Sequence, residues 1–88
     1  MGIRLSVLDL ATTGDGVTPR DALLASAVVA KHAEKLGYLR YWFSEHHNMP
    51  RIVSSTPGIL AGFIAANTER IRVGSGGVML PNLSLIHI

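Results

Sequence analysis

Residues 41–48 read Tyr41-Trp42-Phe43-Ser44-Glu45-His46-His47-Asn48, and the segments on either side make sense as the neighbours of this stretch. Its first three side chains are large aromatic groups that favour β-strands. An acid, two imidazoles and an amide follow within one short element and the loop after it. The pattern predicts a buried strand that carries a polar site at its C-terminal end.

Three apolar runs have the length and composition of strands. Residues 3–8 form a compact run that meets polar surroundings at Asp9. Residues 39–44 form the second predicted strand. The third predicted strand covers residues 71–80. At Ser75-Gly76-Gly77 it has one small side chain followed by two residues with none.

Two helices are predicted between these strands. Thr18-Pro19-Arg20-Asp21 combines a hydroxyl N-cap, a proline at the first helical position and an acid three residues after the cap. This helix should end before Gly37, a residue suited to the left-handed conformation that follows a helix. Ser55-Thr56-Pro57 repeats the starting pattern and predicts a second helix over residues 57–67. His32, in the middle of the first helix, is expected on the surface.

The order strand, helix, strand, helix, strand predicts the α/β class, with a parallel sheet and right-handed crossovers. Both helices then lie on one face, and nothing in the chain covers the other face or the edges. We therefore expect an incomplete domain, the N-terminal part of a (β/α)₈ TIM-type barrel. Strand starts near residues 3, 39 and 71 imply about 250 residues for eight such units. The alternative is half of an open doubly wound sheet, but no G-x-G-x-x-G follows the first strand.

Composition places the chain among packed globular proteins. Its 88 residues are 48% hydrophobic and 16% charged, which excludes an intrinsically disordered chain. The net charge of +2 comes from basic residues that fall singly along the chain, so we expect no nucleic-acid partner. There is no cysteine, and no apolar run has the length of a membrane span or of a signal peptide. We expect a cytoplasmic protein with no membrane partner.

Two histidines follow the second strand, and only one of them can enter a pocket there. Adjacent residues on a strand point to opposite faces, so His46 and His47 cannot both face one site. Barrels place their sites at this end of the strands, which favours one catalytic or ligand-orienting imidazole. The alternative is two loop histidines with ordinary hydrogen bonds. No metal site is expected, because neither H-E-x-x-H nor H-x-x-E-H occurs, and neither His32 nor His87 has a suitable spacing.

The glycines of the third strand and the aromatic run of the second are the other candidate features. Gly76 and Gly77 would let a flat ligand approach backbone N–H and C=O groups, or would serve only a bulge or a turn. Tyr41, Trp42 and Phe43 are expected mainly in the core, although one ring could wall a slot for a planar cofactor.

Three of these stretches together resemble a known family. They are residues 41–47, residues 55–57 and the run V-G-S-G-G-V-M-L-P-N at residues 73–82. Residues 3–82 look like the N-terminal part of the bacterial-luciferase-like, flavin-dependent monooxygenase family. The resemblance implies a (β/α)₈ barrel that binds reduced FMN or, in some relatives, the deazaflavin F420.

The resemblance also implies roles for individual residues. His46 matches the family's site histidine near the flavin, and Ser44 and Glu45 precede it in the implied cofactor-binding site. Gly76 and Gly77 would lie under the isoalloxazine, with a non-prolyl cis peptide bond between them.

The implied reaction uses reduced FMN and O₂ to form a peroxyflavin that oxygenates a small organic substrate. His46 would exchange a proton near neutral pH. A separate flavin reductase is an implied partner, and family members often dimerise. The alternatives are an F420-dependent oxidoreductase on the same barrel and a catalytically silent, truncated product.

The end of the chain departs from the family pattern. Residues 1–82 follow the barrel, whereas residues 83–88 lack the His-small-Pro continuation that family members usually have. We expect this tail to be extraneous to the native protein. No residue can be assigned to the flavin phosphate, so the fragment alone is expected to bind flavin poorly and to be inactive.

Overall fold

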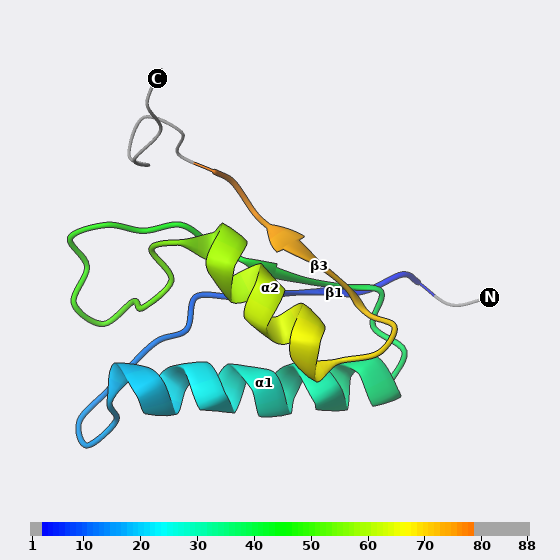
Figure 1. Ribbon diagram of the computed structural model, residues 1–88, viewed down its shortest axis with the longest axis horizontal. Coiled ribbons are helices and arrows are strands. Elements are labelled where there is room, and N and C mark those ends of the chain that lie inside the picture. Colours follow the sequence, from blue (N-terminus) through cyan, green and yellow to red (C-terminus); the bar gives the residue numbers. More distant parts are fainter. Residues whose placement is uncertain (1–2, 79–88) are drawn as a thin grey trace.

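The computed structural model describes residues 3–78, and these contain five elements in the predicted order (Figure 1). They are β1 (Ser6–Asp9), α1 (Pro19–Lys35), β2 (Arg40–Phe43), α2 (Pro57–Asn67) and β3 (Arg72–Ser75). The predicted α/β class and element order are confirmed. The predicted departure at residues 83–88 lies outside the described residues.

The three strands form one parallel sheet in the order β1-β2-β3. Figure 1 shows both helices on the same side of this sheet, as two successive crossovers of the same hand require. Within the part of the chain that the structure describes, β1 and β3 each have one strand neighbour. Both edges of the sheet are therefore open, as expected for a piece of a barrel.

The strands are shorter than the apolar runs that predicted them. The predictions were residues 3–8, 39–44 and 71–80, whereas each observed strand has four residues. All four residues of β1 pair with β2, and all four of β2 pair with β3. An apolar pattern reports burial, whereas a strand extends only as far as the pairing register.

The capping chemistry predicted for α1 is present at both ends. The Thr18 hydroxyl accepts a hydrogen bond from the Asp21 backbone N–H at 3.1 Å, and the Asp21 carboxylate accepts one from the Thr18 N–H at 3.2 Å. Pro19 occupies the first turn. Beyond Lys35 the chain turns at Gly37, whose φ of +87° lies in the left-handed region.

Helix α2 begins at Pro57 as predicted, but without the expected side-chain cap. The Thr56 hydroxyl makes no capping hydrogen bond. The residue three positions later is Ile59, which has no polar side chain to complete a capping box, and its N–H donates to the Thr56 carbonyl at 3.1 Å. Pro57, whose fixed φ suits the first turn of a helix, favours the start at this position. Neither helix in residues 3–78 combines the length and the apolar character needed to cross a membrane.

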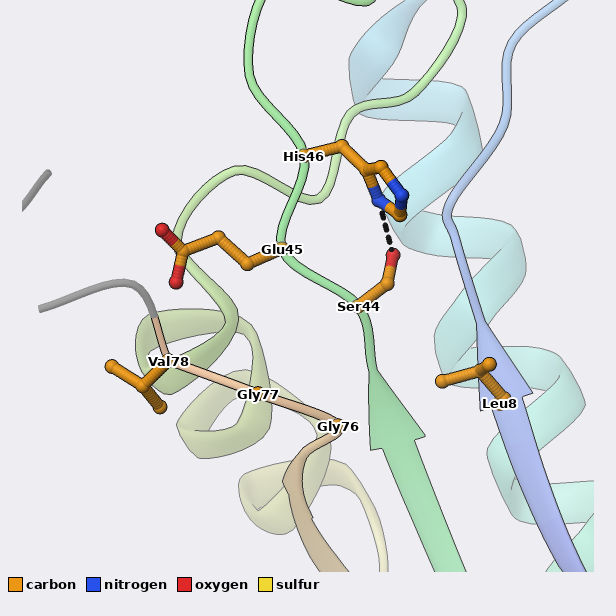
Figure 2. A pocket seen from close by; sticks show the side chains of 7 residues that line it. All are labelled: Leu8, Ser44, Glu45, His46, Gly76, Gly77 and Val78. Atoms are coloured by element: carbon orange, nitrogen blue, oxygen red, sulfur yellow. Dashed lines mark hydrogen bonds between the residues drawn. The ribbon is translucent and has the colours of Figure 1, made fainter.

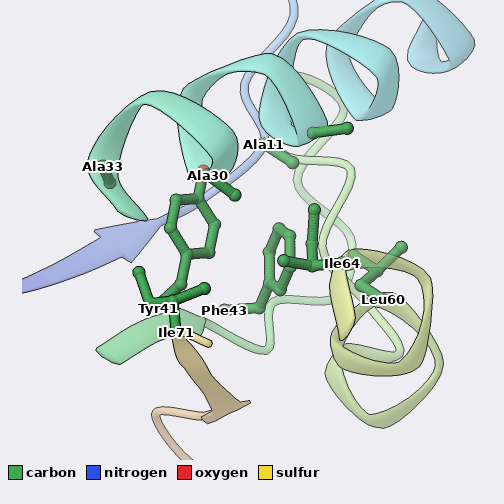
Figure 3. Close-up of a cluster of buried hydrophobic side chains, with 9 residues drawn as sticks. Ala11, Ala30, Ala33, Tyr41, Phe43, Leu60, Ile64 and Ile71 are labelled. Carbon is green, nitrogen blue, oxygen red and sulfur yellow. The ribbon is translucent and has the colours of Figure 1, made fainter. Parts of the chain in front are cut away.

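The core lies between the sheet and the two helices (Figure 3). Tyr41 and Phe43 enter it from β2, fully buried, and their rings pack edge to face with centroids 5.6 Å apart. Helix α1 contributes small side chains such as Ala30, which let it approach the sheet closely. Ile64 of α2 packs on the other side of the aromatic pair. Two of the three aromatic residues are thus core residues, as predicted.

The opposite face of the sheet is uncovered. Leu8 of β1 and Trp42 of β2 are register partners on this face, and they are 60% and 37% exposed. Parallel sheets are normally covered on both faces. The exposed face therefore corresponds to the inner wall of a barrel, and the helical face to its outer layer.

Candidate active site

Three residues that directly follow β2 form the first half of the site. Ser44 and Glu45 are buried, and His46 is half-buried. The Ser44 N–H donates to the Asp9 carbonyl at 3.2 Å, so the chain leaves the sheet only after Ser44. Because the strands are parallel, these residues lie at the same edge of the sheet as the end of β3.

His46 is held by two hydrogen bonds. Its ring Nδ1 lies 3.0 Å from the Ser44 hydroxyl, and its backbone N–H donates to the Ser54 carbonyl at 2.9 Å. Figure 2 shows the imidazole above Ser44, beyond the end of β2, with the hydrogen bond between the two drawn as a dashed line. The other ring nitrogen, Nε2, has no hydrogen-bond partner among residues 3–78. One nitrogen is therefore fixed, and the other is available to a ligand.

Ser54 is a buried residue that sequence reasoning did not single out. Its hydroxyl donates to the Ser44 carbonyl, and its own carbonyl accepts the His46 N–H, so it closes the loop that carries the imidazole. Next to it, the Val53 N–H donates to the Ala11 carbonyl at 2.9 Å, which ties this loop to the one after β1. The available signal was the hydroxyl cluster before the second helix, which we attributed to the helix start alone.

His47 pairs with Glu45 instead of entering the pocket. Its Nε2 lies 2.6 Å from Glu45 Oε2, and the Glu45 side chain is only 2% exposed. A carboxylate this deeply buried needs a hydrogen-bonded or charged partner, and His47 supplies it. The prediction that only one of the adjacent histidines enters the pocket is confirmed, because His46 lines it and His47 does not.

The chain after β3 supplies the second half, with two glycines that carry no side chain followed by Val78. The Gly76 N–H donates to the Phe43 carbonyl at 2.7 Å, which holds this segment against the end of β2. A Cβ at Gly76 would lie 3.3 Å from Leu8 Cδ1 and 3.4 Å from the Phe43 carbonyl oxygen. A Cβ at Gly77 would meet nothing within 4 Å. Gly76 and Gly77 thus form a ledge, tight at Gly76 and open at Gly77, which we call the glycine ledge.

The cis peptide predicted within the glycine ledge is absent. All described peptide bonds, including the one between Gly76 and Gly77, are trans. A cis bond that does not involve proline costs about 3 kcal/mol or more and persists only where the surroundings impose it. The space around Gly77 is open and imposes nothing, so this prediction was wrong.

One pocket of about 410 Å³ joins the two halves of the site (Figure 2). It is lined by Leu8, Ser44, Glu45, His46, Gly76, Gly77 and Val78. All five residues predicted for the site therefore line a single pocket at the C-terminal edge of the sheet. Apolar side chains, a carboxylate and an imidazole meet around it, the mixture typical of small-molecule sites. The roles of these residues remain predictions.

Two other candidates lie away from this pocket. Trp42 lies on the exposed face of the sheet, and its ring does not line the pocket. Its ring atom Cε3 is 3.9 Å from the position that a Cβ at Gly76 would take. His32 is exposed on α1, as predicted. Over residues 3–78, no group of three His, Asp or Glu side chains is arranged to hold a metal ion.

Comparisons with known proteins agree with this architecture. The chain matches the family model for luciferase-like monooxygenases over residues 3–88. It is 51% identical over 82 residues to a luciferase-like monooxygenase of Escherichia coli (strain K12). It is 48% identical over 82 residues to the N-acetyl-S-alkylcysteine monooxygenase of Bacillus subtilis (strain 168). Each match covers 93% of this chain but only 24% and 25% of the relatives, so the chain spans about a quarter of their length.

Two solved structures share the fold. One is apo-MsnO8, with a TM-score of 0.86 and 44% identity over 91% of this chain and 24% of that one. The other is the oxygenating constituent of 3,6-diketocamphane monooxygenase from Pseudomonas putida, in complex with FMN, with a TM-score of 0.82 over 94% of this chain and 23% of that one. At 19% identity, the second likeness concerns the fold alone. Together, the family match and the β-α-β-α-β start of a TIM-type barrel show that the chain belongs to the luciferase-like monooxygenase family.

Proposed function

We propose that this chain forms the N-terminal part of a flavin-dependent monooxygenase, with reduced FMN lying on the glycine ledge. The observation that carries the proposal is that His46 and the glycine ledge, far apart in sequence, line one pocket. This pocket lies at the C-terminal ends of β2 and β3, the edge at which barrel enzymes of this architecture build their active sites. Membership in a monooxygenase family supports the reaction class.

The residues of the pocket fit a flavin ring system, which is planar with apolar faces and a polar edge. Leu8 and Val78 offer apolar contacts, and Gly77 leaves open space where any other residue would place a side chain. Ser44 and Glu45 line the same pocket, with the Ser44 hydroxyl bonded to His46 and the Glu45 carboxylate bonded to His47. The solved structure that contains FMN is the reason we propose FMN as the cofactor, with F420 kept as the alternative.

When bound, reduced FMN would supply the electrons that activate O₂ for the oxygenation of a small organic substrate. His46 is the pocket residue suited to moving a proton, because histidine exchanges protons near neutral pH. The Ser44 hydroxyl engages Nδ1 at 3.0 Å, so the proton is taken up or released at Nε2. Glu45 is engaged by His47 at 2.6 Å, and we assign it the task of holding the loop.

The partners in this proposal follow from the reaction class. A small organic substrate and O₂ would enter the pocket from its open side, and a separate reductase would supply the reduced flavin. The proposal includes a dimeric parent protein that works in the cytoplasm.

Substitution of single histidines in the full-length protein tests the proposal. His46→Ala should lower turnover about 100-fold or more while FMN remains bound, because positioned proton transfer contributes about that much. His32→Ala is the matched control, since it removes an exposed imidazole of α1 that lies away from the pocket, and it should leave turnover nearly unchanged. FMN binding is followed by flavin absorbance and fluorescence. Unchanged turnover of His46→Ala, or binding of F420 but not FMN, would contradict the proposal.

A further inference from the structure

The exposed face of the sheet carries two adjacent arginines at the end opposite to the active-site pocket. The strand register places Arg40 of β2 directly beside Arg72 of β3. Side chains alternate along β2, so Arg40 lies on the same face as Trp42, away from the buried Tyr41. Neighbouring strands are about 4.8 Å apart, which brings two positive side chains together. Like charges at such a position destabilise a sheet unless something compensates them.

Two pockets flank these arginines. One, of about 220 Å³, is lined by Arg40 and Arg72 together with Trp42 and Gly74. The other, of about 450 Å³, is lined by the same two arginines and by Arg4. Of the residues that the structure describes, no Asp or Glu lines either pocket. Three arginines therefore line pockets at this end of the sheet.

The carboxylates of this chain are engaged elsewhere. Its six acidic residues have these contacts: Asp9 with Tyr41 and Ser26, Asp15 with Arg51, Asp21 with Thr18, Glu34 with the backbone of residues 69–71, Glu45 with His47, and Glu69 with Arg70. No ion pair between residues in the range 3–78 includes Arg4, Arg40 or Arg72. Residues 79–88 contain neither Asp nor Glu. Among residues 3–78 no carboxylate pairs with these arginines, which leaves them open to a counter-charge from outside this range.

We propose that Arg40 and Arg72, with Arg4 beside them, form a docking site for carboxylate side chains on the strands that complete the barrel. This chain covers 24% of its Escherichia coli relative, and in a closed barrel the remaining strands enclose the exposed face. An enclosed guanidinium needs a paired counter-charge, and its planar fork donates two parallel hydrogen bonds to a carboxylate.

The charge pattern specifies the partner layer. We expect the strands that complete the barrel to present Asp or Glu side chains opposite Arg40 and Arg72. Opposite Leu8 and Trp42, the exposed apolar pair whose Trp42 lies two residues beyond Arg40 on the same face, we expect these strands to present apolar side chains. This inference concerns the assembly of the barrel and not its reaction, so it stands or falls independently of the proposed function.

Thermal unfolding of the full-length protein tests the docking site with two double variants. Arg40→Gln with Arg72→Gln removes both charges and leaves the opposing carboxylates without partners, so Tm should fall by at least about 5 °C. Arg40→Lys with Arg72→Lys keeps the charges and should lose less than half as much. The control is Arg51→Gln with Arg70→Gln, which removes two exposed surface pairs and should shift Tm by about 2 °C at most.

Each other result has a defined meaning. If the glutamine variant stays within the range of the control, no carboxylate faces the arginines and the proposal is wrong. Equal losses for the glutamine and lysine variants, including failure of both to fold, would mean that guanidinium packing and not charge matters, and would contradict the proposal. Failure of the glutamine variant alone to fold would support the proposal. Sulfate that stabilises only the wild type would identify a free anion as the occupant, and a Tm gap that depends on protein concentration would identify a second chain. Both would overturn the proposal.

Discussion

Removal of the Tyr41 hydroxyl is the perturbation whose effect the structure defines most closely. Tyr41 is fully buried, and its hydroxyl donates to the carboxylate of Asp9. The same carboxylate oxygen accepts a hydrogen bond from the Ser26 hydroxyl at 2.6 Å, so strand β1, strand β2 and helix α1 meet at one acid. Tyr41→Phe removes a single hydrogen bond and leaves the ring in the core.

The size of the effect follows from the burial of the two partners. A hydrogen bond to a charged acceptor contributes about 1.5–3 kcal/mol. Asp9 is only half-buried, so water can replace the lost donor, and the bond from Ser26 remains. We therefore expect Tyr41→Phe to lower the free energy of unfolding by about 1–2 kcal/mol, which corresponds to a Tm lower by about 2–4 °C.

Urea and thermal unfolding of the full-length protein measure this difference. Tyr38→Phe is the matched control, because the Tyr38 hydroxyl has no hydrogen-bond partner among residues 3–78 and its loss should cost less than about 0.5 kcal/mol. If Tyr41→Phe and Tyr38→Phe were equally stable at neutral pH, the hydrogen bond to Asp9 would contribute nothing and the reasoning would be refuted.

The pH dependence provides a second check on the same group. Burial, followed by the hydrogen bond to Asp9 and the charge of Asp9, raises the pKa of Tyr41 above its ordinary value. A group whose pKa is raised on folding contributes stability that is complete below its unfolded pKa, which is about 10 for tyrosine, and lost as the pH rises through its folded pKa. The wild type should therefore lose stability above pH 10 more steeply than Tyr41→Phe.

Three further predictions concern the loop that carries His46, the segment just before β3, and the glycine ledge. Ser54→Ala should destabilise the full-length protein by about 1–3 kcal/mol because a buried carbonyl loses its donor, whereas Ser55→Ala should have little effect in the same urea titration. The backbone N–H groups that bond Glu34 lower the pKa of this carboxyl, so its contribution is present above its unfolded pKa and lost as the pH falls through its folded pKa. The Tm gap between wild type and Glu34→Gln should accordingly be largest at neutral pH and close below about pH 4. Gly76→Ala should weaken FMN binding about tenfold by fluorescence titration, because the new methyl group would occupy the ledge, 3.3 Å from Leu8 Cδ1 and 3.4 Å from the Phe43 carbonyl oxygen.

The parts of the fold that could be predicted rest on local chemistry and on parallel topology. The capping box of Thr18 and Asp21 and the left-handed Gly37 act within a few residues, so their meaning is readable in the sequence. The meeting of His46 with the glycine ledge followed from topology, since parallel strands bring their C-terminal ends to one edge of a sheet.

The parts that could not be predicted depend on contacts between distant segments. Ser54 became a site residue only because its loop folds back on the end of β2. Likewise, the Glu34 carboxylate on α1 accepts backbone N–H groups just before β3, a contact for which the sequence has no spacing rule. The trans bond after Gly76 depends on open space around it that no local pattern reports.

A crystal structure of the full-length protein with FMN would test the central claim most directly, since it would show where the isoalloxazine lies relative to His46 and the glycine ledge. We expect the ring to lie against the Gly76-Gly77 backbone, with the Nε2 atom of His46 facing the reacting edge of the ring or the substrate beside it. A flavin bound at the opposite end of the strands, near Arg40 and Arg72, or one that leaves His46 facing solvent, would contradict it.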